Sequence, residues 1–256
     1  MTATAVIAFP AQQIPSDGAQ ARLLGLYPQI QQGLWLQRTK TLGGIMTPQQ
    51  WRTMAVIARR FTPGTPLHLT TRQDIEIHDL APQDVPLVQQ AMTEAGITGQ
   101  GACGDTVRNL TVCPCSGLKA GRPDLAPLAW QIRRLLERQE AVYALPRKFK
   151  ISLSACADAC AQPFINDVGL VAVKRDAAWG FRVIAAGSLG ARPDTGIEIF
   201  DWLAPGDVPP FALAALRIFA EHGDRTNRRK ARLRHVRSEE HTSELQSQFH
   251  LVCRLL

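Results

Sequence analysis

The 256-residue sequence is poor in aromatic side chains and contains no long hydrophobic run. Aromatic residues make up 6% of the chain and are not interleaved with its 29 Lys and Arg residues, which argues against a surface that stacks nucleic-acid bases. No apolar stretch approaches the roughly 18–20 residues needed to span a membrane. The N-terminus lacks the basic segment that opens a signal peptide. We therefore expect a cytoplasmic protein with neither a nucleic-acid nor a membrane partner.

The composition is otherwise that of a globular protein with a basic surface. Hydrophobic residues make up 45% and charged residues 20%, and the net charge is +7. Such a surface attracts polyanionic ligands or acidic proteins, although a merely solvated basic surface explains the same charge. In a cytosolic protein, the six cysteines are more often free thiols or metal ligands than disulfides.

The first part of the chain alternates strand and helix patterns. Thr47 is placed to cap a helix that begins at Pro48, and Trp51, Met54 and Ile57 are predicted to line its buried face. Strand, helix, strand and helix patterns follow one another at residues 33–44, 47–61, 67–80 and 81–96. This order predicts a small α+β unit of ferredoxin-like type.

A glycine-rich change of composition separates this unit from a second one. Five glycines fall within residues 96–117, where the backbone is expected to approach a ligand closely. Beyond them, helix, strand, hairpin and helix patterns lie at 126–140, 148–155, 167–190 and 209–223. We predict four segments: an N-terminal segment, the ferredoxin-like unit, a second α+β unit and a separate tail, at 1–29, 30–96, 97–236 and 237–256.

Cationic side chains gather at strand ends and in glycine-rich loops. They come from "TTRQ", "GACGDTVRNLTVCPC" and "LPRKFK", and are Arg72, Arg108, Arg147, Lys148 and Lys150. Arginine binds anions through rigid paired donors, while lysine is a mobile charge that can also deliver protons. Together they predict a site for a multiply anionic ligand. Taken singly, each is better explained as a solvated or salt-bridged surface cation.

The cysteine spacing is compatible with a metal centre. Cys156 and Cys160 are separated by three residues, and Cys113 and Cys115 by one. The Cys156–Cys160 spacing suits two ligands of one iron–sulfur cluster, while the Cys113–Cys115 spacing is tight for one cluster. Buried free thiols and a zinc site remain alternatives.

Several of these stretches, in this order, resemble siroheme-dependent nitrite and sulfite reductases. They are "HLTTRQDIEIHDL", "GACGDTVRNLTVCPC", "LPRKFKISLSAC" with "IND", and "WGFRVIAAGSLG". "NRRKARLR" is similar to the helix start that ends the first of the family's two repeats. The resemblance covers residues 30–236 and implies an α+β fold. A ferredoxin-like half-domain would be followed by the siroheme-binding nitrite/sulfite reductase hemoprotein domain.

The resemblance also implies the chemistry. The family uses siroheme and a [4Fe–4S] cluster to reduce nitrite to ammonia or sulfite to sulfide by six electrons. Because the sequence shows no flavin- or NAD-binding segment, the electrons are expected from a separate ferredoxin or flavoprotein. Two alternatives remain open: a precorrin-3B synthase-like oxygenase of the same superfamily, and a fragment that binds tetrapyrrole without catalysis.

Site residues carry over where the motifs match. The implied catalytic residues are Arg72, Arg108, Lys148 and Lys150. The implied siroheme contacts are Gln73, Asn109, Arg147, Gly187, Lys230 and Arg232. These cations suit siroheme because it is a polycarboxylate, and they suit an oxyanion that must gain protons as it loses oxygen as water.

The cysteines depart from the family pattern. The family's first ligand pair has five intervening residues, but the position that would pair with Cys113 is Lys119. Two interpretations stay open. Either Cys113, Cys156 and Cys160 ligate a cluster, or they are remnants and the ligands lie in a missing second half.

The last twenty residues have a different character. "RSEEHTSELQS" and "LVCRLL" within 237–256 resemble the translation of a short-read sequencing adapter. We expect this tail to be an artefact and exclude Cys253, His241 and His250 from the site. The protein would then be truncated near Val236 and inactive as this chain alone.

Overall fold

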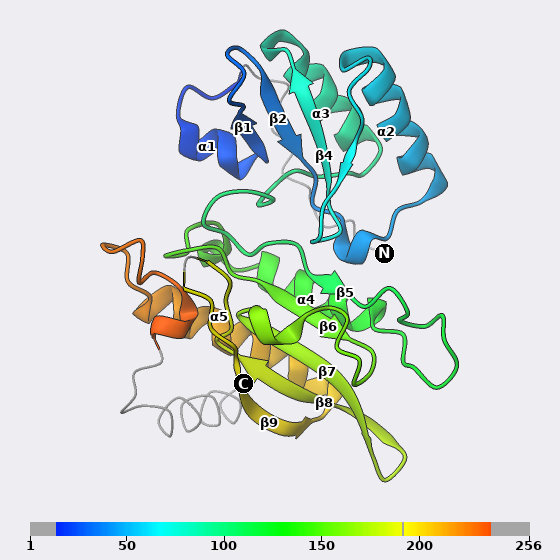
Figure 1. The fold of residues 1–256 in the computed structure, drawn as a ribbon, viewed down its shortest axis with the longest axis vertical. Helices are drawn as coiled ribbons and strands as arrows, with labels where there is room; N and C mark the ends of the chain where they lie inside the picture. The colour runs from blue at the N-terminus through cyan, green and yellow to red at the C-terminus, as the bar shows by residue number, and fades with distance from the viewer. Residues whose placement is uncertain (1–13, 191, 237–256) are drawn as a thin grey trace. The chain divides into compact units, whose positions relative to one another are not determined.

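The chain divides into two compact α+β units in a computed structural model that describes residues 14–190 and 192–236 (Figure 1). The first unit holds Met1–Thr41 and Ile45–Gly104, and the second holds Leu42–Gly44 and the chain from Asp105 onward. The tail predicted to be artefactual, 237–256, lies outside the described residues. Within the described ranges, no helix is both long and apolar enough to cross a membrane.

The first unit is an antiparallel four-stranded sheet with three helices, of which two, α2 and α3, pack against each other. Its strand order is β1-β2-β4-β3 (Figure 1). The strands are β1 (Leu26–Pro28), β2 (Trp35–Arg38), β3 (His68–Leu69) and β4 (Ile75–Leu80). The helices are α1 (Gly18–Leu23), α2 (Pro48–Phe61) and α3 (Val85–Glu94). Alternation along β4 buries Ile75 and Ile77 in the core that Met54 of α2 and Val88 of α3 complete. The predicted ferredoxin-like α+β unit is confirmed.

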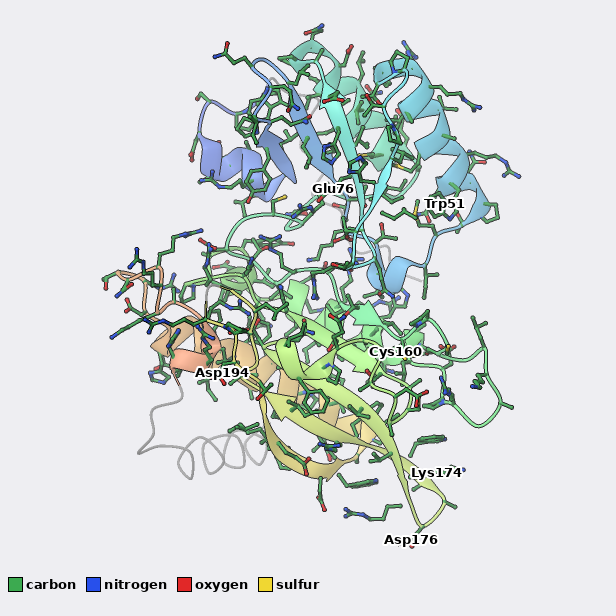
Figure 2. The ribbon with its side chains drawn as sticks, in the orientation of Figure 1. Trp51, Glu76, Cys160, Lys174, Asp176 and Asp194 are labelled. Carbon is green, nitrogen blue, oxygen red and sulfur yellow. The ribbon has the colours of Figure 1, made fainter. Side chains whose placement is uncertain are left out.

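Helix α2 begins as predicted but buries a different face. Thr47 Oγ1 accepts from Gln50 N at 3.2 Å, and Gln50 Oε1 accepts from Thr47 N at 2.9 Å, so the pair forms a capping box. Met54 and Ile57 are fully buried, but Trp51 is 42% exposed and its predicted burial is wrong (Figure 2). With 3.6 residues per turn, Trp51 lies about 120° around the axis from Ile57, at the edge of the apolar stripe.

The second unit is a mixed five-stranded sheet covered by two helices. Its order is β5-β6-β7-β8-β9, in which β5, β6 and β7 are parallel and β7, β8 and β9 antiparallel. The strands are β5 (Thr111–Val112), β6 (Ile151–Ser154), β7 (Val168–Arg175), β8 (Ala178–Ala185) and β9 (Ile197–Leu203). The helices are α4 (Ala126–Glu137) and α5 (Val208–His222).

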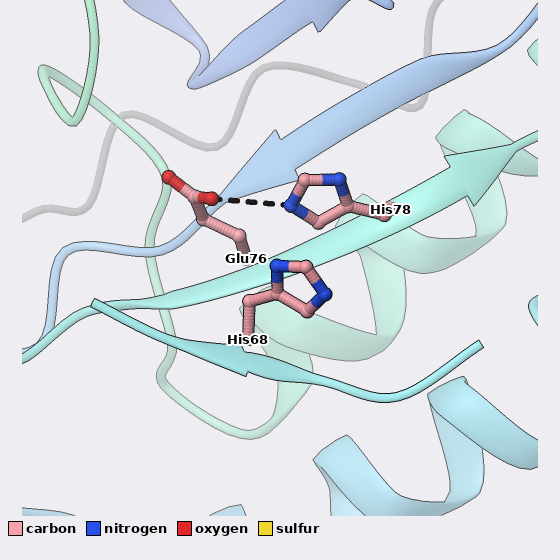
Figure 3. Close-up of side chains that lie close together, drawn as sticks. All are labelled: His68, Glu76 and His78. Atoms are coloured by element: carbon pink, nitrogen blue, oxygen red, sulfur yellow. Dashed lines mark hydrogen bonds and ion pairs between the residues drawn. The ribbon is translucent and has the colours of Figure 1, made fainter. Parts of the chain in front are cut away.

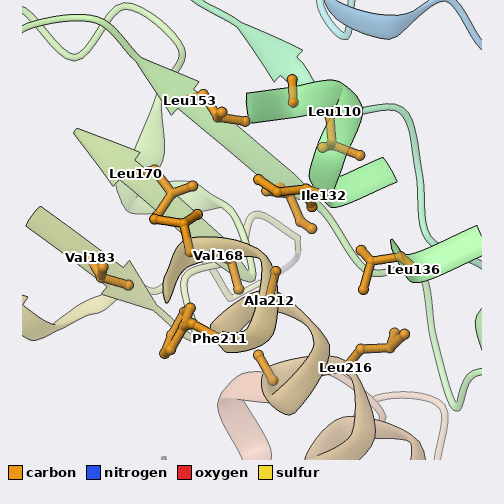
Figure 4. Packing of buried hydrophobic residues seen from close by; sticks show 14 of the residues in the cluster. Leu110, Ile132, Leu136, Leu153, Val168, Leu170, Val183, Phe211, Ala212 and Leu216 are labelled. Carbon is orange, nitrogen blue, oxygen red and sulfur yellow. The ribbon is translucent and has the colours of Figure 1, made fainter. Parts of the chain in front are cut away.

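One apolar core joins this sheet to its helices. Leu153, Leu170 and Val183 from three neighbouring strands pack with Ile132 of α4 and Phe211 of α5 (Figure 4). All five side chains are 0% exposed. β7 reads as a near-continuous apolar run because successive residues, which point to opposite faces of the sheet, are all buried from Val168 to Ala172. The core thereby holds the carboxyl ends of β5 and β6 side by side.

The predicted hairpin at 167–190 is present as β7 and β8. Arg175 pairs with Ala178, so Asp176 and Ala177 form a two-residue turn. Their φ values are 49° and 68°, both in the left-handed region that such hairpin turns require. Aspartate tolerates this conformation, whereas an alanine Cβ is strained there.

The helix expected from "NRRKARLR" is wrong. The chain forms turns from Asp224 to Arg232, followed only by a 3-10 helix at Leu233–His235. Asp224 Oδ1 accepts from the backbone N–H groups of Thr226 and Asn227, each at 2.8 Å. These local bonds offer the backbone an alternative to the helical ladder.

Replacing Ala177 with glycine should stabilise the second unit. We expect Ala177→Gly to raise the free energy of unfolding by about 1 kcal/mol, because glycine removes the left-handed strain. Ala58→Gly in the middle of α2 is the control and should lower it by about 1 kcal/mol. Urea denaturation of the three proteins measures both changes, and a loss of stability in Ala177→Gly would contradict the turn geometry.

Candidate functional site

Two predicted site residues of the first unit, Arg72 and Gln73, lie in the turn between β3 and β4. Gln73 N donates to Thr70 O, and Thr70 N donates to Asp74 O, both at 2.9 Å. Gln73 has φ 62°, so the turn passes through the left-handed region. Residues 67–80, predicted as a strand pair or one long strand, are therefore a strand pair joined by a tight turn that presents Arg72 and Gln73 at its tip.

A buried carboxylate organises the cations of this unit. Asp74 is 4% exposed, and one of its oxygens accepts from Thr41 N at 3.0 Å. Burial raises the pKa of Asp74 to about 7, although the Thr41 N–H and the charges of Arg72, Arg38 and Lys40 oppose the change.

Arg38 and Lys40 were missed by the sequence reasoning. Their proximity to Asp74 places them with Arg72 in one cationic group of the first unit. Lys40 is 4% exposed, which is unusual for a lysine. The signal was the alternation in "QRTK", because residues two apart on extended backbone share a face.

In the second unit, Arg108 lies on the extended segment that neighbours the one carrying the two predicted lysines. Val107 forms a parallel bridge with Phe149, and Arg108 N donates to Phe149 O at 2.8 Å. Lys148 and Lys150 flank Phe149 directly, so three predicted catalytic cations belong to two adjacent extended segments. Asn109, the next predicted residue, is 1% exposed.

Lys150 is held by a buried ion pair. Its backbone N donates to Asp167 Oδ2 at 2.9 Å, and Arg232 Nη2 contacts both carboxylate oxygens of Asp167 at 3.0 and 2.8 Å. Asp167 is 0% and Arg232 8% exposed. Arg232, predicted from the sequence to reach a cofactor carboxylate, thus has its guanidinium bound to a carboxylate of the chain itself.

Two further predicted siroheme contacts, Arg147 and Lys230, differ in how they bond to the rest of the chain. Arg147 Nη1 pairs with Asp105 Oδ1 at 3.1 Å, and Arg228 Nη1 takes the other oxygen of Asp105 at 2.9 Å. Lys230 is exposed, and its backbone N donates to Asn227 O at 2.8 Å. The basic segment near the end of the described chain therefore supports the Arg147 loop.

Gly187 occupies a position without room for a side chain. A Cβ there would lie 2.1 Å from Phe164 O. Its N–H donates at 2.9 Å to the carbonyl oxygen of Asn166, in the segment that leads into β7. The next residue, Ser188, is 1% exposed, and its hydroxyl makes no hydrogen bond with any part of the chain that the structure describes.

The three predicted cysteine ligands all follow the carboxyl ends of the neighbouring strands β5 and β6. Cys113 follows β5 and Cys156 follows β6, while a turn through Ala159 at φ 53° returns Cys160 toward them. The Cys160 thiol is hydrogen-bonded to Cys113. Partial desolvation, together with the Cys113 and Cys156 thiols, raises the pKa of Cys160.

These three thiols are one short of the four that a [4Fe–4S] cube takes. Such a cluster takes four thiolates, each on a different iron, so the sulfurs stand apart around the cube. Cys113, Cys156 and Cys160 supply three thiols rather than four, and the Cys160 thiol interacts with that of Cys113. Cys156 instead donates to Asp158, which also pairs with Arg122 at 2.8 Å. We therefore derive no chemical step through a cluster on these cysteines.

Breaking the buried pair should destabilise the second unit. We expect Arg232→Met to lower the free energy of unfolding by about 3–5 kcal/mol, because it leaves the Asp167 carboxylate buried without its cation. Asp167→Asn combined with Arg232→Met should recover part of the loss, since the amide oxygen still accepts from Lys150 N. Urea denaturation measures both, and a single variant as stable as the unmodified chain would contradict the pairing.

Asp74 should make the stability depend on pH. Its folded pKa of about 7 lies above the ordinary 3.8, so between these values the folded state holds a proton that the unfolded chain releases. Stability therefore falls as pH rises through this window, by about 1.4 kcal/mol for each unit of separation. Asp74→Asn should remove the fall, and Asp207→Asn, at an exposed carboxylate, should retain it. Denaturation between pH 4 and 8 measures the difference; parallel profiles for wild type and Asp74→Asn would contradict it.

Comparison with sequence families gives two matches in tandem. Residues 27–95 match the nitrite/sulfite reductase ferredoxin-like half domain. Residues 103–249 match the nitrite and sulphite reductase 4Fe-4S domain, so this match ends inside the tail predicted to be artefactual.

Individual relatives agree with both matches. The assimilatory ferredoxin-dependent nitrite reductase of Haloferax mediterranei is 30% identical over 80% of this chain and 38% of its own length. A sulfite reductase [NADPH] hemoprotein beta-component of Xylella fastidiosa is 30% identical over 78% of this chain and 40% of its own. The Mycobacterium tuberculosis NirA structure shares the fold with a TM-score of 0.78 at 24% identity, covering 91% of this chain and 45% of that protein. The chain spans about two fifths of the curated relatives it matches, and it belongs to the nitrite and sulfite reductase family.

Proposed function

We propose that this chain forms a siroheme- and oxyanion-binding part of an enzyme that reduces nitrite to ammonia or sulfite to sulfide. The observation that carries the proposal is the adjacency of Arg108 to Lys148 and Lys150 through the Val107–Phe149 bridge. Three cations on neighbouring extended segments form a strong focus for an anion. The relatives are more than twice as long as this chain, so the six-electron reaction of the whole enzyme is part of the proposal rather than of the family assignment.

The residues of the second unit suit a polycarboxylate such as siroheme. Arg147, held by Asp105, and Asn109 lie on the same two segments as Arg108. Ser188 adds a buried hydroxyl that has no partner among the described residues and could bond a ligand oxygen. A buried polar group without a partner is costly, so a ligand that satisfied it would be favoured.

The proposed roles follow from the chemistry of each side chain. Bound siroheme would supply the iron at which the oxyanion is reduced. Arg108 would donate hydrogen bonds to oxyanion oxygens and oppose their negative charge. Arg72 of the first unit is proposed, on its family motif alone, as a ligand of the same chemistry. Lys148 and Lys150 would deliver the protons with which those oxygens leave as water.

Positioning is the proposed role of the buried pair. Asp167 fixes the backbone of Lys150, and Arg232 fixes Asp167. Gln73, in its left-handed turn, and Lys230, on the exposed basic segment, are proposed as weaker cofactor contacts. The N–H of Gly187 is already bonded to Asn166 O, so its carbonyl is the group proposed for contact.

The electron donor is proposed to be a separate ferredoxin or flavoprotein. The support is the naming of one relative as ferredoxin-dependent and of another as an NADPH sulfite reductase component. A cytoplasmic location belongs to the same proposal, supported by the assimilatory relative. Neither observation favours nitrite over sulfite.

Siroheme binding tests the proposal directly. Arg108→Ala should weaken siroheme affinity by about 10- to 100-fold, because a hydrogen bond to a charged group contributes about 1.5–3 kcal/mol. Arg134→Ala, which removes an equal charge from an exposed position on α4, should bind as the unmodified chain does. Absorbance titration gives the affinities, and circular dichroism checks the fold. Failure of the unmodified chain to bind siroheme, or equal loss in both variants, would overturn the proposal.

A further inference from the structure

Two histidines and a glutamate gather on one face of the first unit's sheet. His68 on β3 stands directly opposite Glu76 on β4, and His78 follows Glu76 by two residues. Side chains two apart on a strand share a face, as do directly paired residues of neighbouring strands. The strand register therefore brings the three side chains together, on the face opposite to buried Ile75 and Ile77 (Figure 3).

Their donor atoms have the spacing of metal ligands. One ligand atom from each of His68, Glu76 and His78 lies within 4.8 Å of the other two, and within the described ranges this is the one such group of His, Cys, Asp or Glu. His78 Nε2 and Glu76 Oε2 are 3.1 Å apart. Around a tetrahedral zinc ion, with ligand bonds of about 2.0–2.2 Å, donors stand about 3.3 Å apart. The two imidazole centroids are 4.1 Å apart with their planes tilted by 33°.

A neighbouring arginine orients the carboxylate. Arg38 on β2 pairs in register with Glu76, and its Nε donates to Glu76 Oε1 at 2.7 Å. Oε2 is thereby left directed toward His78. Ligating carboxylates commonly carry such an outer hydrogen bond. The arginine charge lowers the affinity for a cation, but it also keeps the carboxylate fixed.

The surroundings allow an ion to enter. His68 is exposed, and the side chains of His78 and Glu76 are 20% and 13% exposed. The group is thus partly buried but remains accessible to an ion from solvent. Three protein ligands would leave one position of a tetrahedral ion to water, as in open zinc sites.

We propose that His68, Glu76 and His78 form a binding site for a divalent first-row transition metal of the zinc and cobalt class. Two imidazoles with one carboxylate suit these ions, whereas magnesium and calcium prefer all-oxygen ligands. None of the three ligands is among the residues proposed for siroheme or the oxyanion, so this inference does not depend on the proposed function.

Cobalt(II) titration of the chain tests the site and separates it from the cysteines. Cobalt held by nitrogen and oxygen shows visible d–d bands, while cobalt held by thiolates adds an intense sulfur-to-metal charge-transfer band. We expect one equivalent of cobalt to bind with d–d bands alone and to be displaced by zinc. His68→Ala and His78→Ala should each weaken the cobalt affinity by about tenfold or more. Loss of a residue that only hydrogen-bonds a metal ligand already lowers metal affinity by about that factor, and loss of a ligand itself should cost at least as much.

His222→Ala is the matched control. His222 is a half-exposed histidine at the end of α5 in the second unit, and its loss should leave the cobalt affinity unchanged. Because His68 is exposed, His68→Ala should fold normally, which circular dichroism verifies. The proposal is overturned if cobalt shows only the thiolate band, if no cobalt binds, or if His68→Ala binds it as tightly as His222→Ala does.

Discussion

The buried Asp167 carboxylate is the constraint on which the candidate site of the second unit depends. Asp167 directly precedes β7. Its carboxylate accepts a hydrogen bond from the backbone N–H of Lys150, which directly precedes β6, and two from the guanidinium of Arg232. Three segments far apart in the sequence are thus tied to one charge that is 0% exposed. An ion pair at such a depth contributes little net stability, but each of its partners is costly to remove. The Asp167–Arg232 pair therefore fixes the positions of these segments more than it adds to the free energy of unfolding.

The first unit uses a second buried carboxylate in a similar way. Asp74 accepts from Thr41 N and lies among Arg72, Arg38 and Lys40. In both units, then, cations proposed to meet an anion are arranged beside an acidic group that is itself withdrawn from solvent. An arginine or lysine in these places is oriented before any ligand arrives, which reduces the ordering cost of binding.

The sequence predicted most elements because their signals are local. Thr47 and Pro48 opened α2 as expected, and the left-handed pair Asp176 and Ala177 closed the hairpin. Where prediction failed, a non-local or competing contact decided. Trp51 lies at the edge of a stripe whose centre depends on where the sheet packs, and the Asp224 side chain diverted the backbone that was expected to be helical.

By itself, the sequence determined the order of the elements, the α+β class and the motifs that place the chain in its family, because these depend on periodicity, caps and residue identity. The tertiary structure alone decided which charges meet. The bridge between Val107 and Phe149 set Arg108 beside the lysines, and Arg232 was joined to Asp167 across 65 residues. The strand register also joined His68 to Glu76 and His78. Such partners are chosen by strand pairing and burial, and neither can be read from the spacing of residues along the chain.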